Sequence, residues 1–341
     1  MRLGPSICLL ATVLALAAGP CLAGQAVLLV RNAPPDGLVL VDVDLAPLLG
    51  ETRPPAGPVA VEAMLGDKPV PVQAWTDEQA WAGLRTRAGG TILLKLPGGG
   101  DHRVIVRGGA TNPSPPSQNA LTGALQTVRT PYLVVTHDAA RFGGLPSRIE
   151  ILGSGKTVSD KNYRWDDRLH SRELGGRRLA SRGTGILPVR PTGVPPVVQD
   201  RDGPATHGRD AHATPPVTLL SDGPLAAVVR VRGQYVAPQP GAKPDARAVY
   251  DLVYFRDRPL VLVRARTDKL NDRDWDEQHV LELTFNDKSF PRWAGGGPLQ
   301  QGEFTGTKQG TTLPHWGALV DGRSAVALLR GGRPLIYDGL G

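Results

Sequence analysis

Apolar and polar residues alternate along most of this chain, and the alternation predicts β-strands. The clearest case is residues 225–236, where Val229, Val231 and Tyr235 fall on one face while Arg230 and Arg232 fall on the other. A period of two sends successive side chains to opposite faces of a strand. We therefore expect one buried face and one wet face for this strand.

Further strands are predicted where short β-branched or aromatic runs are bounded by turn residues. They cover residues 38–43, 58–64, 68–75, 91–96, 102–106, 132–136, 148–152, 249–255, 260–265, 279–285, 316–320 and 324–329. Turn residues at 66–67, 98–100 and 321–322 predict hairpins, and only residues 76–84 have a helical pattern. The sequence thus predicts an all-β fold, with a small N-terminal β-barrel or sandwich followed by a larger antiparallel β-sandwich.

Two segments interrupt this rhythm and divide the chain. Residues 111–118 have the composition of a linker, rich in Pro and Ser. They separate an N-terminal domain at 24–110 from a sandwich domain at 119–341. Residues 183–216 are rich in Pro and Gly and contain no aromatic residue. Such a segment buries too little surface to offset its ordering entropy, so we expect a disordered proline-rich insertion there.

The first residues have the pattern of an export signal. Arg2 precedes an apolar run at 7–18, and small residues precede a cleavage position after Ala23. We expect a signal peptide at 1–23 and a secreted or periplasmic protein. The run is too short to span a bilayer comfortably, and no later stretch is long enough, so no transmembrane segment is predicted. Acylation at Cys21 is an alternative, although Pro20 argues against it.

Cysteine content and charge narrow the function classes. Both cysteines, Cys8 and Cys21, lie in the predicted signal peptide, so thiol catalysis and cysteine-ligated zinc are excluded for the mature chain. The full chain carries +7, and removal of Arg2 leaves +6 because residues 1–23 hold no other charge. This charge is spread along the chain, which favours acidic partners such as uronic-acid polymers rather than nucleic acid.

One segment resembles a phosphate-binding loop. Residues 153–157 read Gly-Ser-Gly-Lys-Thr, but Glu150 stands where that motif needs its first glycine. We predict a hairpin turn instead.

Another segment resembles a calcium loop. Asp272, Asp274 and Asp276 alternate as calcium ligands do, but Glu277 occupies the position where an EF-hand needs glycine. An EF-hand is excluded, and a calcium site of another kind is the alternative to a solvated loop. No metal site or other cofactor is predicted.

Aromatic and charged residues gather in the second half of the chain. Flat indole faces beside hydrogen-bonding groups suit sugar rings, so Trp165, Trp275 and Trp293 are candidate substrate contacts. Arg168 and Arg258 are candidates to hold a uronate carboxylate. The structural alternative is that each Trp packs in the core and each Arg pairs with a neighbouring Asp.

Two chemistries on an acidic sugar suggest different catalytic residues. Elimination needs a base for the C5 proton and a cation for the carboxylate, and His170, His279 and Tyr254 are candidate bases. Hydrolysis needs two carboxylates, for which Glu277 and Glu303 are candidates. On a regular strand His279 shares its apolar face with leucines, a pattern more typical of a hydrogen-bonded core residue.

Three segments resemble the central sandwich of the exo-rhamnogalacturonan lyase family. They read Ser-Asp-Gly-Pro-Leu-Ala-Ala-Val-Val-Arg-Val-Arg-Gly at 221–233, Tyr-Asp-Leu-Val-Tyr-Phe at 250–255 and Pro-Leu-Val-Leu-Val at 259–263. Val72-Gln73 and the turn at 96–98 are similar to the small β-barrel that comes first in such proteins. The resemblance implies an exported protein that acts on acidic, pectin-type polysaccharide.

The same family carries a large C-terminal α/α toroid, and this sequence to Gly341 contains none. A fragment and an accessory protein that keeps only the β part are both open, and no catalytic residue is carried over from the family. Three functions remain in competition: a lyase-like enzyme, a non-catalytic carbohydrate-binding module, and a structural cell-surface β-sandwich.

Overall fold

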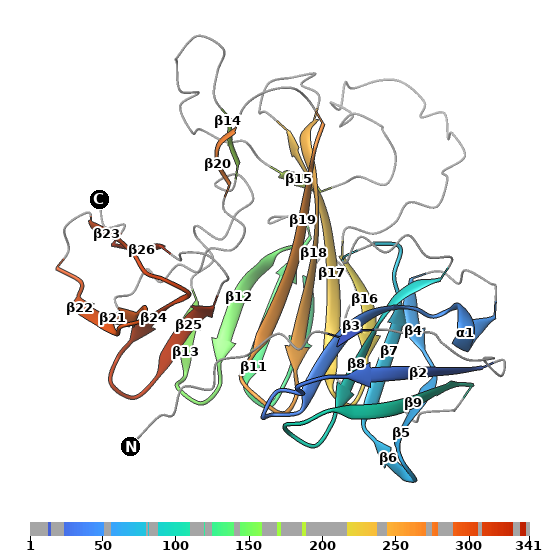
Figure 1. Ribbon diagram of the computed structural model, residues 1–341. Helices are drawn as coiled ribbons and strands as arrows, with labels where there is room; N and C mark the ends of the chain where they lie inside the picture. The colour runs from blue at the N-terminus through green and yellow to red at the C-terminus, as the bar shows by residue number, and fades with distance from the viewer. Residues whose placement is uncertain are drawn as a thin grey trace, which may run out of the picture.

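Nearly all of the described chain is antiparallel β-structure, which confirms the predicted all-β class (Figure 1). The computed structural model describes residues 13–14, 24–50, 56–79, 81, 88–109, 119, 125–139, 144–158, 169–171, 186–188, 217–236, 244–270, 275–278, 289–305, 309–329 and 335–338. Among these residues the one helix is α1 (Ala46–Leu49), and no helix is long and apolar enough to cross a membrane.

Two sheets form the N-terminal unit. The first has the order β1-β2-β9-β5-β6, with β1 (Val13–Leu14), β2 (Gln25–Val30), β9 (His102–Gly108), β5 (Val61–Leu65) and β6 (Lys68–Val70). The second has the order β3-β8-β7-β4, with β3 (Leu38–Asp44), β8 (Gly89–Lys95), β7 (Val72–Thr76) and β4 (Gly57–Val59). Alternate apolar residues of both sheets meet in one core that draws only on residues up to Val106.

Two sequence predictions fail in this unit. The strands flanking Gly98–Gly100 do not form a hairpin, because β8 pairs with β3 and β7 whereas β9 pairs with β2 and β5. The glycines instead carry the chain from one sheet to the other: a Cβ on Gly98 would collide with the carbonyl oxygen of Pro35. The predicted helix at 76–84 is also wrong in its described part, since β7 runs to Thr76 and residues 77–79 are not helical.

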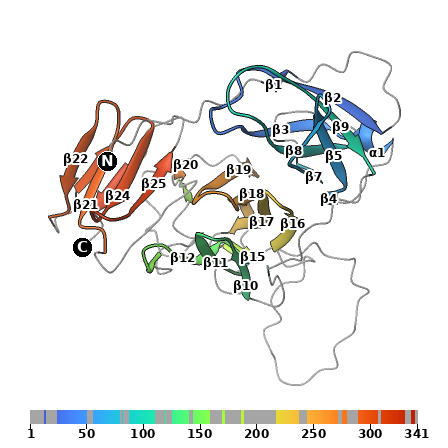
Figure 2. The same ribbon diagram turned by 90° about the horizontal axis from the view of Figure 1, so that it is seen from below.

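The central sheet lies between the N-terminal unit and a further sheet. It runs β15-β17-β18-β19, with β15 (Ile186–Pro188), β17 (Ala226–Val236), β18 (Pro244–Phe255) and β19 (Val261–Lys269), and β16 (Val217–Asp222) also pairs with β17. The further sheet runs β10-β11-β12-β13, with β10 (Leu125–Arg129), β11 (Leu133–Asp138), β12 (Pro146–Ile151) and β13 (Lys156–Val158). Figure 2 shows β16–β19 between the N-terminal sheets and β10–β12.

Both faces of β17 and β18 are therefore buried, and each face serves a different core. Val229 and Tyr250 pack toward β10–β12, while Val228 and Val253 pack with Trp75 of β7. The predicted alternation of β17 is correct, but the prediction of a wet face is wrong. The β3-β8-β7-β4 sheet covers that face, including Arg230, which is fully buried.

A glutamine side chain fastens these two sheets to one another. The Gln73 side chain of β7 donates through Nε2 to Ser221 Oγ and to the Ala226 carbonyl, each at 2.8 Å, and accepts from the amide of Ala226 at 3.1 Å. The side-chain amide of Gln73 thus bonds both the N–H and the carbonyl of Ala226, the first residue of β17, and this carbonyl also accepts from the Gly223 amide.

The C-terminal part contains one more sheet and a two-stranded ribbon. The sheet runs β22-β21-β24-β25, with β22 (Gln300–Glu303), β21 (Arg292–Gly295), β24 (Trp316–Val320) and β25 (Ala325–Leu329). The ribbon pairs β23 (Gln309–Thr312) with β26 (Leu335–Asp338). The predicted hairpin around Gly322 is confirmed by the β24–β25 pair, and the turn at Gly155 by the β12–β13 pair.

A second ribbon pairs β14 (Leu169–Ser171) with β20 (Trp275–Gln278). The predicted linker at 111–118 and the strand at 279–285 lie outside the described residues. So does most of the predicted insertion at 183–216, although its residues Ile186–Pro188 form β15 and pair with β17.

A buried histidine joins the central sheet to β11. The His137 side chain is fully buried, and its Nδ1 lies 2.7 Å from the Gly144 carbonyl, which can only accept a hydrogen bond. The proton is therefore on Nδ1, and Nε2 accepts from the Tyr254 hydroxyl at 2.9 Å. Burial lowers the pKa of His137 to about 4, against a smaller raising effect of the Gly144 hydrogen bond.

We predict that this histidine makes the fold sensitive to acid. Because the unfolded chain binds a proton near pH 6.5 and the folded chain only near pH 4, the stability it contributes is lost as pH falls through that window. The free energy of unfolding, measured in urea, should therefore fall by about 2–3 kcal/mol between pH 7.5 and pH 4.5. His137→Gln keeps a hydrogen-bond donor and an acceptor but does not titrate, so the unfolding free energy of this variant should change less with pH between about 7.5 and about 4.5. An unchanged pH dependence would contradict the role of His137.

Candidate functional site

The densest group of charged residues lies between β7 and the central sheet. Arg230 donates from Nε to Asp251 Oδ1 at 2.7 Å and from Nη2 to Asp251 Oδ2 at 2.8 Å. The same Nη2 donates to Asp77 Oδ2 at 2.6 Å, from the end of the N-terminal unit's β7. These three residues, the interdomain clamp, are all buried. One guanidinium thus bonds two carboxylates that come from different units of the fold.

The clamp is strongly shielded from water. Burial alone lowers the pKa of Arg230, but hydrogen bonds to Asp251 and Asp77 outweigh it and hold the pKa above its ordinary value. Burial also lowers the pKa of the neighbouring Arg232, partly offset by the same two carboxylates. Charges held in this way are costly to separate, because removing one partner leaves the others buried without compensation.

The residues around the clamp also form hydrogen bonds within the protein. Trp81 donates from Nε1 to Asp77 and Asp251, each at 3.0 Å, and its ring lies 4.8 Å below the Arg264 guanidinium carbon. Arg264 in turn donates to both carboxylate oxygens of Asp42 at 2.7 Å. Charged residues with a tryptophan in an interdomain seam can indicate a binding site. Here each group is already paired, so we interpret the seam as structural.

We predict that Arg230→Met destabilises the fold by about 3–5 kcal/mol, because Asp77 and Asp251 then stay buried without a cation. The triple variant Arg230→Met/Asp77→Leu/Asp251→Leu should recover most of that loss. Arg266→Met is the matched control, since the Arg266–Asp268 pair is half exposed and is worth less than about 1 kcal/mol. Denaturant unfolding gives the stability of all three variants. If Arg230→Met costs no more stability than Arg266→Met, the role of the clamp is contradicted.

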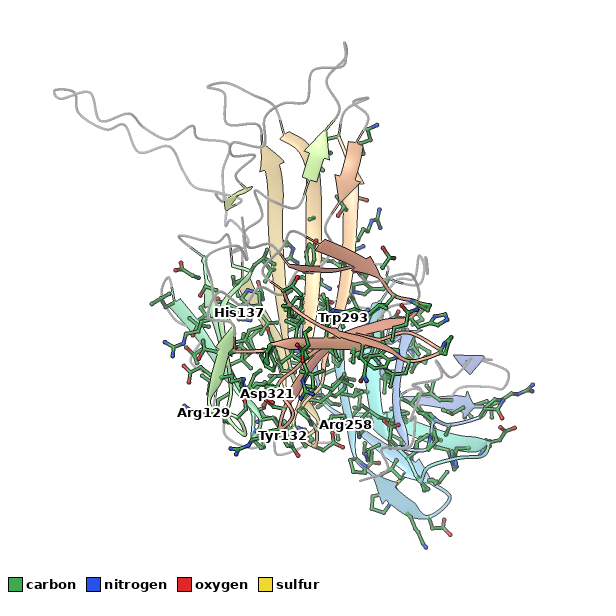
Figure 3. The ribbon with its side chains drawn as sticks, turned by 90° about the vertical axis from the view of Figure 1, so that its left-hand side faces the viewer. Arg129, Tyr132, His137, Arg258, Trp293 and Asp321 are labelled. Atoms are coloured by element: carbon green, nitrogen blue, oxygen red, sulfur yellow. The ribbon has the colours of Figure 1, made fainter. Side chains whose placement is uncertain are left out.

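The β22-β21-β24-β25 sheet has one packed face. The Trp293 indole lies against Gly302 of β22, where a Cβ would be 2.7 Å from the ring. Leu313, which is fully buried, packs against Gly295 from the same side, and Leu319 is the cross-strand neighbour of Trp293. Figure 3 labels Trp293 on this sheet and Asp321 at the end of β24. Glycine at 302 is therefore needed to make room for the indole.

The other side of this sheet is exposed along its two edge strands, β22 and β25. Cross-strand partners point to the same side of a sheet, so the register assigns to this open face the side chains of Glu303, Gln301, Arg292, Ala294, Trp316, Ala318, Val320, Ala325, Ala327 and Leu329. Leu329 is 64% exposed, and Trp316 is half-buried. The open face therefore combines an indole and small apolar side chains with a polar edge.

The polar residues of the open face have free hydrogen-bonding groups. Arg292, Gln301 and Glu303 are exposed, and within the described part of the chain their side chains make no hydrogen bond or ion pair. The Arg292 guanidinium reaches the β24–β25 turn, where a Cβ on Gly322 would be 2.9 Å from Nη2. Unlike the arginines of the clamp, Arg292 can therefore pair with an external anion.

Lys156 links this sheet to the β10–β13 sheet. Its Nζ lies 2.6 Å from Asp321 Oδ2 and 4.3 Å from the centre of the Phe290 ring, and it donates to the Ser289 carbonyl. The hydrogen bond from Lys156 holds the pKa of Asp321 below its usual range, together with backbone amides of the turn. The β24–β25 turn thus attaches this sheet to the β10–β13 sheet.

Two predicted site residues lie where the fold already uses them. Tyr254 is 1% exposed and donates to His137, so it lies in the core rather than on a surface that a polysaccharide reaches. Arg258 donates to Asp257 from Nε and Nη2, each at 2.7 Å, and also pairs with Asp36. The hydrogen bond to Asp257 raises the pKa of Arg258. Two carboxylates therefore already occupy this proposed holder of a uronate.

The remaining predicted residues divide into three groups. Glu303 lies on the open face and Trp293 on the packed face of the same sheet. His170 and Glu277 are direct partners in the β14–β20 ladder, and Trp275 is opposite Ser171 after a register shift. Trp165, Arg168 and His279 lie outside the described residues, as do the acidic positions of the calcium alternative except Asp276. Among the described residues there is no cluster of three metal-ligating side chains.

Sequence reasoning missed the residues that the structure brings together. Trp316, Gln301 and Arg292 were not selected because they come from three strands, and β24, which carries Trp316, pairs with β21 rather than with its neighbour in sequence, β23. The signal that could have found them is the alternation of 316–320, which puts Trp316 on the side opposite to Leu319. A scan against models of known protein families finds no match to this chain, and a search of curated proteins finds none either.

Proposed function

We propose that this chain is an exported carbohydrate-active protein that binds an acidic, pectin-type polysaccharide on the open face of the β22-β21-β24-β25 sheet. The observation that carries the proposal is that Trp316 shares this face with the unpaired side chains of Arg292, Gln301 and Glu303. An indole can stack on the apolar C–H face of a sugar ring, and the polar groups can bond its hydroxyls.

The preference for an acidic ligand rests on Arg292. A guanidinium matches a carboxylate with two parallel hydrogen bonds, and such charge-assisted bonds are about twice as strong as neutral ones. The net charge of +7 on the whole chain adds a weak general attraction for polyanions. The sequence resemblance to the exo-rhamnogalacturonan lyase family agrees with this ligand class.

Binding without hydrolysis fits this face better than hydrolysis does. Glycoside hydrolysis needs two carboxyl groups that flank the scissile bond. Glu303 is the only carboxylate that the four described strands place on the open face. Its predicted partner Glu277 belongs to β20, in the ladder with β14. We therefore assign Glu303 to hydrogen bonding with sugar hydroxyls.

We predict that Trp316→Ala and Arg292→Gln each weaken binding to pectin by about tenfold, which corresponds to about 1.4 kcal/mol. Calorimetry with homogalacturonan measures the affinity, and added salt should reduce the contribution of Arg292 because exposed charges are screened. Arg129→Gln is the matched control, since Arg129 is an exposed residue of β10, in another sheet (Figure 3). If both open-face variants bind pectin as tightly as the wild type, the proposal is contradicted.

A second candidate function, elimination, is favoured by one observation: the β14–β20 ladder places His170 opposite Glu277. In this reaction a base removes the C5 proton of a uronate and the C5–H electron pair forms a C4=C5 double bond. The C4–O bond breaks with its electron pair on the leaving oxygen, which takes a proton from water. Both residues were candidates from the sequence, but only the register pairs them.

We predict that, if the ladder is catalytic, pectin gains the ultraviolet absorbance of unsaturated uronates and His170→Gln abolishes the gain. Glu277→Gln should reduce the rate by about 10²-fold or more while leaving pectin affinity unchanged. If pectin still binds but the absorbance does not rise, only the non-catalytic binding function is supported.

A further inference from the structure

Among the described residues, the corners of the open face are exposed at both ends of the line from Arg292 to Trp316. The residues at its corners are exposed: Glu303 beside Arg292, Ala325 across the sheet, and Leu329 beside Trp316. A site that recognises a chain end needs a closed end that blocks further sugar units. A flat, open-ended surface lets a chain continue past both ends of the site.

The two strongest contacts on this face are also far apart. Val320 is directly opposite Arg292, and Trp316 lies four residues from Val320 along β24. At about 3.4 Å per residue, the Cα positions at the two ends are separated by about 14 Å along the strand. The Arg292 guanidinium also reaches Gly322, past Val320 and away from Trp316. A single sugar ring is shorter than this separation, so we expect that one ring does not engage the indole and the guanidinium at once.

The residues between the two ends are small. Ala294 and Ala318 lie between Arg292 and Trp316 on the two central strands, and Ala318 is 5% exposed. Small side chains project little above the two central strands, so we expect an extended ligand to lie along these strands. Gln301 flanks this middle region from β22 and can bond the hydroxyls of a central ring.

We propose that the open face recognises an internal stretch of an acidic polysaccharide, several rings long, and does not recognise a chain end. This inference rests on the proposed function and specifies how the same face reads its ligand. Arg292 takes the carboxylate of one ring and Trp316 stacks on another ring further along the chain. Both contacts form only when one ligand covers the whole distance, so affinity depends on ligand length.

Calorimetry with galacturonic acid and its oligomers of increasing length tests this inference, with polymer as the reference. We expect weak binding of the monomer and dimer, and a rise of about tenfold or more once an oligomer spans both ends. Chemical reduction of the oligomer's terminal residue should leave the affinity of long oligomers unchanged. Full affinity for the monomer or dimer, or loss of binding after the end is modified, would overturn it.

The same two substitutions, measured with ligands of two lengths, supply the second test. With long oligomers, Arg292→Gln and Trp316→Ala should each weaken binding. With a dimer, at most one of the two substitutions should weaken binding. Arg129→Gln should affect neither ligand. Absence of binding to every acidic oligomer and polymer would refute the proposed function itself, whereas length-independent binding refutes only the internal-stretch mode.

Discussion

The pairing of one buried arginine with two aspartates holds this fold together. Arg230 belongs to the central sheet, and its partner Asp77 follows the last residue of β7 in the N-terminal unit. Buried charges of this kind contribute less net stability than well-packed apolar residues, because their desolvation is costly. Their value is specificity: only one relative position of the two sheets lets Arg230 bond both aspartates. The clamp thus fixes the arrangement that Gln73 and the apolar contacts of Trp75 then consolidate.

This fixed arrangement explains why the central sheet can have two buried faces. An antiparallel sheet commonly leaves one face in water, and a strand with arginines on alternate positions would normally do so. Here the N-terminal unit covers the arginine face, and the clamp compensates the charges that this covering buries. The opposite face is free to form the second core with β10–β12, in which His137 and Tyr254 supply the polar contact.

Much of the fold could be predicted from local patterns, and the failures have physical causes. Alternation and turn residues located the strands at 38–43, 132–136 and 316–320, because these signals depend on neighbours in sequence. The environment of Arg230 could not be predicted, since Asp77 is 153 positions away in sequence. The glycines at 98–100 were taken for a hairpin, although they permit a close approach to Pro35 between two sheets. Glu303 was predicted as a site residue, but its partner Arg292 and the placement of Trp316 on the same face required the register.

The attachment of the open face through Lys156 and Asp321 has a consequence for the evolution of the protein. The side chains at positions 292, 301, 303 and 316 contribute nothing to the clamp or to the two central cores. Substitutions there can therefore accumulate with little penalty in folding, so ligand preference can diverge between descendants that share one scaffold. The same separation makes these positions a natural choice for randomised libraries.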